Sequence, residues 1–327
     1  MKKKILVWLL IIFFVANVSV AQAQQPTKIP RIGYLGAASL SANSARTEAF
    51  RQGLRELGYV EGKNILIEWR SAEDKADRLP GLAAELVRLK LDVIVTGGSI
   101  VTRAAKEATK TIPIVMAQDT DPIGNGVVAS LARPGGNITG LSTLAPELSG
   151  KRLELLKETV PKLSRVVVFG TSTNPDNAQT LREVDLAAKA FGLQLQFLDV
   201  RDPKDIETAF RAASKGRADG VLVLTAAVLV SRRTQVVELA VTSRLPAIYH
   251  RSDFVEDGGL MFYGVNLTDL NRRAATYVDK ILKGRTPADL PVEQPMKFEF
   301  IVNLKAAKAI GLAIPPYVLV RADKVIQ

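Results

Sequence analysis

The stretch Arg31-Ile-Gly-Tyr-Leu-Gly-Ala-Ala-Ser39 has a counterpart later in the chain, Arg165-Val-Val-Val-Phe-Gly-Thr-Ser-Thr173. Both begin with arginine, continue as a mainly apolar run and reach a glycine followed by small or hydroxylated residues. A repeated set of buried strands predicts two similar α/β lobes. Two further runs are echoed in the same order, 91–98 by 218–226 and 112–119 by 245–253.

Segments of helical character separate these apolar runs. In the segment 45–57, Phe50, Leu54 and Leu57 recur at about one helical turn, and Gly58 follows as a typical helix stop. Alternating strands and helices give parallel sheets with right-handed crossovers. The expected strands are 32–35, 64–69, 93–95, 114–117, 166–169, 194–198, 221–224 and 247–249, and the expected helices are 45–57, 78–89, 100–109, 147–160, 177–191, 203–214 and 229–243. The segments 126–131 and 138–141 flank a turn at 133–136.

The C-terminal part does not follow the repeat. It contains an expected strand at 260–265, a helix at 267–282, a strand at 297–302 and a short helix at 305–310. We interpret it as crossing to the first lobe near Gly258–Gly259 and returning near Leu290, which makes a hinge of three strands. The prediction is an α/β fold of two similar Rossmann-like lobes with parallel sheets, an N-terminal lobe at 30–143 plus 260–288 and a C-terminal lobe at 144–259 plus 289–327.

The first residues, 1–23, are typical of a secretory signal peptide. Lys2–Lys4 precede the apolar stretch Ile5–Val20, and Ala21-Gln-Ala23 supplies small residues where a signal peptidase cleaves. We expect cleavage between Ala23 and Gln24 and a mature protein in the periplasm. An uncleaved anchor is the less favoured alternative, because the apolar run falls short of the about 20 residues that a spanning helix needs.

Composition narrows the classes of function. The chain has 327 residues, more than one compact core usually takes, and 47% of them are hydrophobic. The absence of cysteine excludes disulfides and thiol chemistry, and the single histidine, His250, excludes a site built from several imidazoles. The net charge is +11, but basic residues are mixed with acidic ones, so we expect a solvated basic surface and no nucleic acid partner.

Ligands of open parallel sheets sit beyond the carboxyl ends of the strands. In the loop Thr96-Gly-Gly-Ser99, the glycines permit a close approach to the backbone and the hydroxyls add hydrogen-bond donors. A simple turn with Ser99 as a helix cap is the alternative. The candidate ligand-binding residues are Ser39, Thr96, Gly98, Ser99, Asp119 and Asp121 and, further along the chain, Asn174, Thr225, Tyr249 and Tyr263.

The acidic and aromatic candidates have competing interpretations. Asp119 and Asp121 would point to one side of an extended stretch, where one of them could pair with a ligand ammonium. Turn formation explains these aspartates equally well. Tyr249 and Tyr263 could stack on an aromatic ligand, although aromatic residues in strands more often pack in cores. His250 could line the same cleft, but a lone histidine is more often structural than catalytic.

Three common enzyme signatures are absent. The first strand is not followed by G-x-G-x-x-G, and the chain has neither a G-x-x-x-x-G-K-[ST] phosphate loop nor a G-x-S-x-G nucleophile elbow. No group of residues indicates a catalyst, a metal ion or a cofactor. We therefore expect a binding protein and not an enzyme.

Five stretches carry a more specific signal: Ala49–Asn64, Asp121–Gly124, Ser130–Gly140, Ala274–Leu290 and Ile314–Ile326. The first reads Ala-Phe-Arg-Gln-Gly-Leu-Arg-Glu-Leu-Gly-Tyr-Val-Glu-Gly-Lys-Asn, and the third ends in Arg-Pro-Gly-Gly-Asn-Ile-Thr-Gly. In these stretches the chain resembles the tryptophan/tyrosine-type family of ABC substrate-binding proteins, which have the type I periplasmic binding protein fold. The resemblance covers essentially all of the mature chain.

The resemblance implies a receptor that closes on a small organic solute and presents it to an ABC permease in the membrane. It implies an amino acid or an aromatic or carboxylate compound as the solute, and binding proteins of this kind are commonly monomers. Asp121 is the candidate for a ligand ammonium. By position, Ser39, Thr96, Gly98 and Ser99 would serve from the first lobe, and Asn174, Thr225 and Tyr249 from the second.

Two other functions stay open. The same exported domain could hand its closed form to a membrane kinase or chemoreceptor, and neighbouring genes for a permease and an ATPase would decide for transport. An exported α/β enzyme is less favoured because no catalytic constellation is evident, and turnover of a bound compound would reveal it.

Overall fold

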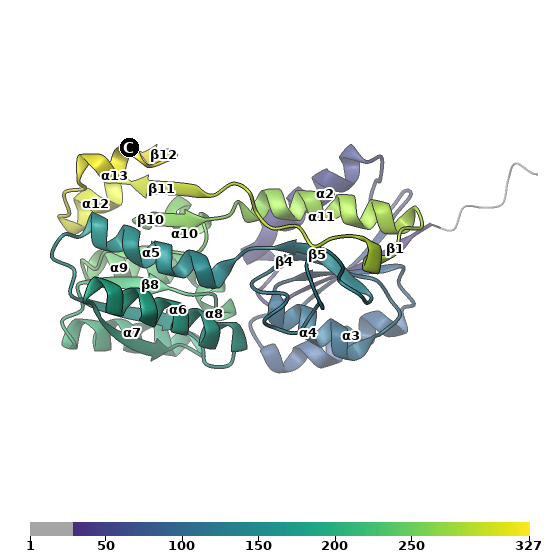
Figure 1. Ribbon diagram of the computed structural model, residues 1–327, viewed down its shortest axis with the longest axis horizontal. Coiled ribbons are helices and arrows are strands. Elements are labelled where there is room, and N and C mark those ends of the chain that lie inside the picture. The colour runs from purple at the N-terminus through teal and green to yellow at the C-terminus, as the bar shows by residue number, and fades with distance from the viewer. Residues whose placement is uncertain (1–28) are drawn as a thin grey trace, which may run out of the picture.

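The computed structural model describes residues 29–327, which form two α/β lobes placed along the long axis of the molecule (Figure 1). The first lobe contains strands β1 (Arg31–Gly36), β2 (Leu66–Ser71), β3 (Val93–Gly97), β4 (Ile114–Asp119) and β5 (Ile138–Ser142), helices α2 (Ser44–Glu56), α3 (Leu79–Arg88), α4 (Ser99–Ala108) and α11 (Leu267–Leu282), and the short helices η1 (Ser41–Asn43), η2 (Ala76–Arg78) and η3 (Pro287–Asp289). Its strands are all parallel, in the order β2-β1-β3-β4-β5.

The second lobe has a seven-stranded sheet. It contains β6 (Arg165–Gly170), β7 (Gln194–Asp199), β8 (Gly220–Val223), β9 (Ala247–Tyr249), β10 (Met261–Gly264), β11 (Glu299–Asn303) and β12 (Lys324–Ile326), with helices α5 (Ala145–Thr159), α6 (Pro175–Phe191), α7 (Pro203–Lys215), α8 (Ala227–Ser231), α9 (Arg233–Thr242), α10 (Asp253–Glu256), α12 (Leu304–Ile310) and α13 (Pro316–Val320). The order is β12-β11-β10-β9-β8-β6-β7, and only the β10–β11 pair is antiparallel.

Each sheet is covered by helices on both faces, which explains the continuous apolar runs in the sequence. Successive strand residues face opposite sides. Val93 and Val95 of β3 therefore join the core under α2 and α11, and Ile94 joins the core under α3 and α4. In β8, Val223 joins the core under α7 and α9, whereas Leu222 joins the one under α5 and α6. The sequence prediction of two parallel-sheet α/β lobes is confirmed.

Helix α11 packs on the first lobe, although second-lobe strands precede and follow it in the sequence (Figure 1). It meets α2 at Gly53, where a Cβ atom would lie 2.2 Å from the Arg272 carbonyl oxygen and 2.9 Å from the Ala275 Cβ. Tyr34 of β1 donates its hydroxyl to Asn271 Oδ1 at 2.7 Å. These contacts fix α11 as a part of the first-lobe core.

Between residues 29 and 327 the chain crosses between the lobes three times, and two of these crossings lie later than the sequence predicts. The prediction places 260–265 in the first lobe, after a crossing near Gly258–Gly259. The structure corrects this, because β10 pairs with β9 and β11 in the second sheet. A buried strand of four residues has the same apolar pattern in either sheet, so its neighbours decide its place.

The return crossing also lies later than the predicted position near Leu290. The backbone N–H of Val292 donates to the Leu131 carbonyl at 2.7 Å, and that of Glu293 donates to the Gly140 carbonyl at 3.0 Å. The segment up to Glu293 is therefore held by the first lobe, and the chain returns between Glu293 and β11.

Smaller differences concern single elements. The helix predicted at 229–243 is divided at Arg232 into α8 and α9. Helices α10 and α13 and strand β12 are short and were not expected. The predicted signal peptide and its cleavage between Ala23 and Gln24 lie outside the described residues. Within 29–327, we find no helix with the length and apolar character required to cross a bilayer.

Candidate functional site

A cleft lies between the lobes, at the carboxyl ends of strands from both sheets. Its first-lobe wall comes from the segments that follow β1, β3 and β4, and its second-lobe wall from those that follow β6, β8 and β9. Helix α4 begins there at Ser99, and α6 begins after Asn174, whose side chain accepts from the Asp176 N–H at 3.2 Å. The free backbone N–H groups at these helix N-termini are hydrogen-bond donors toward the cleft. They also stabilise negatively charged groups close to them.

Five of the ten predicted residues lie on the cleft walls: Gly98, Ser99, Asp119, Asn174 and Thr225. Gly98 has φ of 134°, a conformation that favours glycine, and it turns the chain from β3 into α4. The sequence therefore located the strand-end loops of both lobes. Contact between these residues and a ligand stays a prediction.

Two predicted hydroxyl residues have other partners. Ser39 Oγ accepts from the Ala42 N–H at 3.3 Å and helps to begin the turn before α2. Thr96 is buried, and its Oγ1 lies 2.8 Å from Thr102 Oγ1. Neither side chain lines the cleft.

The two predicted tyrosines lie outside the cleft lining as well. Tyr249 is fully buried and stacks on Phe254, with ring centroids 4.8 Å apart, and its burial raises the pKa of its hydroxyl. Tyr263 packs against Phe298 and Phe300. Neither ring is placed to stack on a molecule in the cleft. The packing alternative for aromatic strand residues is the one that the structure supports.

Two buried carboxylates face the cleft from opposite lobes. Asp119 ends β4 and is 1% exposed, and Asp176 lies in the first turn of α6 and is 5% exposed. Asp119 Oδ2 and Asp176 Oδ1 have no hydrogen-bond partner in residues 29–327. Burial and, second, the charge of Asp176 raise the pKa of Asp119 to about 7. Because an unpaired buried acceptor is unfavourable, a cationic donor in the cleft would stabilise both groups.

Hydroxyl groups connect these carboxylates. Thr120 Oγ1 donates to Asp176 Oδ2 at 2.6 Å, and Ser99 Oγ donates to Asp119 Oδ1 at 3.0 Å. The two hydroxyl oxygens lie 2.6 Å apart. The row Asp119–Ser99–Thr120–Asp176 therefore runs from the first lobe to the second. The sequence analysis missed Asp176 and Thr120. Thr120 lies next to the predicted Asp119, and Asp176 lies close after the predicted Asn174.

The cleft also contains basic side chains that the sequence analysis missed: Arg46 of α2, Arg152 of α5, and Arg201 and Arg251 from loops. Arg46 and Arg152 occupy buried positions in the apolar stripes of their helices. An arginine four residues before Phe50, or four after Leu148, was a signal available in the sequence. It is weak because amphipathic helices often extend an arginine past their apolar edge.

His250 lies among these arginines on the cleft wall. Burial, followed by the charges of Arg251, Arg152 and Arg46, lowers the pKa of His250 well below its usual range. The imidazole is therefore neutral, and both ring nitrogens lack a partner among the described residues. In the same part of the chain, no group of three or more acidic or histidine side chains is arranged to hold a metal ion.

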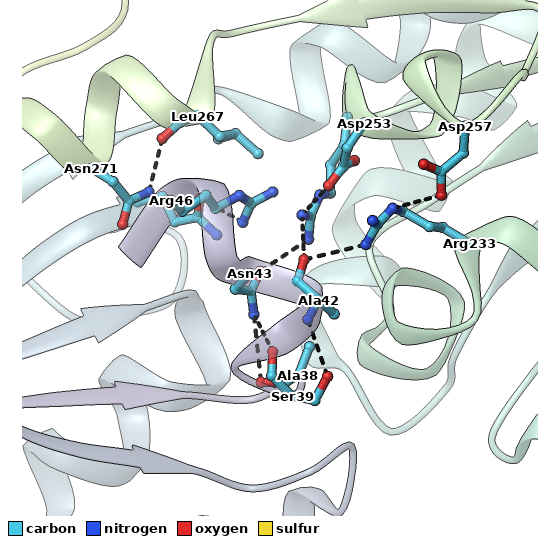
Figure 2. A network of polar contacts seen from close by, with 12 residues as sticks. Ala38, Ser39, Ala42, Asn43, Arg46, Arg233, Asp253, Asp257, Leu267 and Asn271 are labelled. Carbon is cyan, nitrogen blue, oxygen red and sulfur yellow. Dashed lines mark hydrogen bonds and ion pairs between the residues drawn. The ribbon is translucent and has the colours of Figure 1, made fainter. Parts of the chain in front are cut away.

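Polar contacts join the lobes on one rim of the cleft, as Figure 2 shows. Arg251 of the second lobe donates to Asn43 Oδ1 at 3.3 Å and to the Ala42 carbonyl at 3.4 Å. Arg233 donates to the same carbonyl at 3.4 Å. Asp253 pairs with Arg251 and fixes its direction. We call Ala42, Asn43, Arg233, Arg251 and Asp253 the arginine rim.

Two further hydrogen bonds join the lobes. Ser231 donates to Asp74 Oδ1 at 2.7 Å. Gln179 Nε2 donates to Asp121 Oδ2 at 2.7 Å, so the predicted ammonium partner Asp121 has a protein partner outside the cleft lining. Because each contact joins the two lobes, the structure is a closed arrangement.

Gln179→Ala is expected to weaken ligand binding by about two- to tenfold, because one partly exposed side-chain hydrogen bond contributes roughly 0.5–1.5 kcal/mol to the closed form. The loss should come mainly from faster ligand release, since the bond forms only on closure. Stopped-flow and equilibrium titration measure it. Gln52→Ala is the matched control, because Gln52 bonds to Glu56 within one helix. Equal effects of both substitutions would contradict the closure role.

Comparisons with known proteins agree with this architecture. The family profile described as ABC transporter substrate binding protein matches residues 37–326. The chain is 29% identical over 266 residues to a tyrosine-binding protein of Clostridioides difficile, covering 81% of this chain and 76% of the relative. It is 27% identical to the solved structure of an ABC domain in complex with L-Trp from Streptococcus pneumoniae, which covers 91% of this chain and 99% of that one with a TM-score of 0.83.

A third comparison concerns the arrangement of the lobes. The ligand-free, open structure of a substrate binding protein with adhesive properties from Clostridium difficile is 25% identical, covers 91% of this chain and 99% of that one, and has a TM-score of 0.65. Its identity is close to that of the L-Trp complex, so the lower TM-score agrees with the closed rim described above. Fold, cleft and profile match lead to one conclusion: the chain belongs to the family of ABC transporter substrate binding proteins, the solute-binding receptors of ABC importers.

Proposed function

We propose that the protein captures a free amino acid in the interlobe cleft and holds its ammonium group between Asp119 and Asp176. The observation that carries the proposal is that these buried carboxylates come from opposite lobes and that each has an oxygen without a partner among residues 29–327. An ammonium can donate three hydrogen bonds and carries a positive charge that attracts both carboxylates. The tyrosine-binding relative and the structure with L-Trp bound support the same class of ligand.

The remaining cleft lining supports an amino acid with an apolar or aromatic side chain. Apolar side chains from both lobes and from the hinge segments line it: Ile100, Leu148, Val228, Val230, Val265 and Leu267. Binding sites of this kind combine a mainly apolar wall with a few directing polar groups. In this proposal the wall contacts the side chain, and the carboxylates orient the backbone end of the ligand.

Closure of the lobes is the proposed capture step. A ligand that contacts both lobes favours the closed form by the difference in its affinity for the two arrangements. An ammonium between Asp119 and Asp176 meets this condition, because it would interact with one carboxylate from each lobe. It would also offset the repulsion between two carboxylates that closure brings together.

We further propose that the receptor acts as an exported monomer that delivers its ligand to an ABC permease and performs no catalysis. The relatives named above are binding proteins, and the sequence of 1–23 is typical of a signal peptide. Export, monomeric state and delivery are each directly measurable by fractionation, sedimentation and uptake in cells that lack the gene.

A ligand screen tests the proposal. The mature protein, beginning at Gln24, is titrated with the free amino acids by calorimetry and thermal shift. At a hundredfold excess over its dissociation constant, a ligand specific for the folded protein stabilises it by about 2.7 kcal/mol. At least one amino acid should bind with a single site per chain. Failure of every amino acid to bind a refolded, ligand-free sample would refute it.

Amino-acid affinity is expected to rise between about pH 5 and about pH 8, by up to roughly a hundredfold if binding returns Asp119 to an ordinary pKa. The ammonium requires an ionised Asp119, whose pKa lies at about 7 in the closed arrangement of the lobes. The stability of the ligand-free protein should change in the opposite direction. A raised folded-state pKa contributes stability that is present below about pH 4 and lost as the pH rises through about 7.

Calorimetric titration and chemical unfolding across this pH range measure the two trends. Asp119→Asn should remove the pH dependence of the affinity and that of the stability, because asparagine does not titrate. An affinity that does not depend on pH in the unsubstituted protein would contradict the ammonium assignment.

A further inference from the structure

Two arginines on the cleft wall are buried without a carboxylate partner. Arg46 is 8% exposed, and its guanidinium donates to the neutral Gln118 Oε1 at 3.2 Å. Arg152 is 4% exposed and donates to the Tyr263 carbonyl at 2.7 Å and to the Ser149 hydroxyl at 2.9 Å. All these acceptors are neutral. Neither guanidinium forms an ion pair in the part of the chain from 29 to 327.

The other buried arginine of this part of the chain shows the usual arrangement. Arg251 is 5% exposed and pairs with Asp253. Its neighbour Arg233, which is more exposed, pairs with Asp257 at 2.9 Å. Buried charges are normally paired, because removal of a guanidinium from water is unfavourable without a counter-charge. Arg46 and Arg152 depart from this rule, and both line the ligand cleft.

A third group points to the same kind of ligand. His250 is 9% exposed, lines the cleft and has no hydrogen-bond partner on either ring nitrogen among the described residues. His250 and Arg152 also line one smaller pocket together. A neutral imidazole offers one N–H donor. Three buried donor groups without an anionic partner among the described residues therefore line the cleft.

We propose that Arg46 and Arg152, with His250 beside them, form a subsite for a carboxylate of the ligand. Arginine suits this role, since its planar guanidinium can offer two parallel N–H groups to one carboxylate. The two arginines come from α2 and α5, so the subsite, like the acidic pair, joins both lobes. Figure 2 shows Arg46 close to Asn43, on the first-lobe side of the arginine rim.

This inference rests on the proposed amino-acid function and makes it more specific. The cleft then offers two carboxylates, Asp119 and Asp176, and two guanidinium groups, Arg46 and Arg152, which together match the charges of a zwitterion. The carboxylate could be the α-carboxylate of an amino acid or the carboxylate of an acidic side chain. Both present the same chemistry to the arginines, and the experiment below separates them.

The test uses three compounds for each amino acid that the screen contains: the amino acid, its amide, which lacks the α-carboxylate, and its des-amino acid, which lacks the ammonium. We expect the amide to bind at least about thirtyfold more weakly than the amino acid, as loss of one partner of a buried charge pair commonly does. If the carboxylate comes from a side chain, only the acidic amino acids bind, and their α-amides keep the affinity.

Arg46→Gln and Arg152→Gln should each weaken binding of the free carboxylate compound at least about thirtyfold and leave the weak binding of the carboxylate-free amide unchanged. Arg55→Gln is the matched control, because Arg55 lies in α2 like Arg46 but outside the cleft lining, and it pairs with Glu48 at 2.7 Å. Melting temperatures confirm folding. If a glutamine variant does not fold, Arg46→Lys or Arg152→Lys keeps the charge and should lose affinity through the changed geometry alone.

The outcomes separate this inference from the proposed function. Glutamine variants that bind the free amino acid within threefold of the unsubstituted protein would overturn the carboxylate subsite, while the ammonium assignment would stand. A des-amino acid that binds as tightly as its amino acid, and loses affinity in Arg46→Gln, would support the subsite and overturn the ammonium assignment. Absence of binding by every compound would overturn both.

Discussion

Asp176→Asn is expected to weaken amino-acid binding at least about thirtyfold, because loss of one partner of a buried charge pair costs roughly 2–5 kcal/mol. The substitution removes the only carboxylate that the second lobe contributes to the proposed ammonium site among the described cleft residues. The asparagine oxygen can still accept from Thr120, as Asp176 does. The loss should therefore fall on the ligand and not on the fold.

A second readout distinguishes this effect from general damage. The charge of Asp176 helps to raise the pKa of Asp119, so that the pKa should fall in the variant. The pH dependence of ligand-free stability should move to lower pH accordingly. Calorimetric titration and unfolding at several pH values measure both. Asp185→Asn on the same helix is the control, because Asp185 is exposed and paired with Lys189. Equal affinities of the two variants would refute the role of Asp176.

Gly53→Ala is expected to destabilise the first lobe by about 2–3 kcal/mol, the upper part of the range for an overfilled core. The new Cβ would lie 2.2 Å from the Arg272 carbonyl oxygen, a backbone atom that cannot move without shifting α11. Alanine favours a helix by about 1 kcal/mol over glycine, and this gain is too small to offset the clash.

Gly150→Ala supplies the matched comparison. Gly150 lies inside α5, and a Cβ there would meet only the Ala187 Cβ, at an ordinary 3.7 Å. The same substitution should therefore stabilise the second lobe by up to about 1 kcal/mol. Scanning calorimetry of both variants measures the opposite shifts. A melting temperature for Gly53→Ala at or above that of the unsubstituted protein would show that α2 and α11 are not held in contact.

The lobes were predictable because periodicity is a local property. A strand covered on both faces must be apolar throughout, and a helix that packs on one face must be apolar at every turn, so β3 and α2 were evident from the sequence. The place of β10 was not, because its four residues fit either sheet and only the pairing with β9 and β11 decides.

The candidate site also contains residues that a local sequence rule predicts and residues whose place depends on tertiary structure. Ser99, Asp119 and Asn174 follow from the rule that ligands bind at strand ends. Tyr249 was placed there by the same rule, but stacking on Phe254 keeps its ring in the core. Arg46 lies in the first turn of α2 and not in the loop that ends β1, and it reaches the cleft only because the start of α2 faces it. Such orientation is a tertiary property that a local pattern does not contain.

The position of α11 has a consequence for synthesis of the protein. The apolar face of the first sheet, including Val93 and Val95, is covered by α11 as well as by α2. Translation therefore has to pass Leu282 before the first lobe can be completed, long after β5 has left the ribosome at Ser142. Until then this half of the chain keeps an uncovered apolar surface, which general chaperones recognise. Delayed completion suits a protein whose proposed route passes unfolded through a membrane channel.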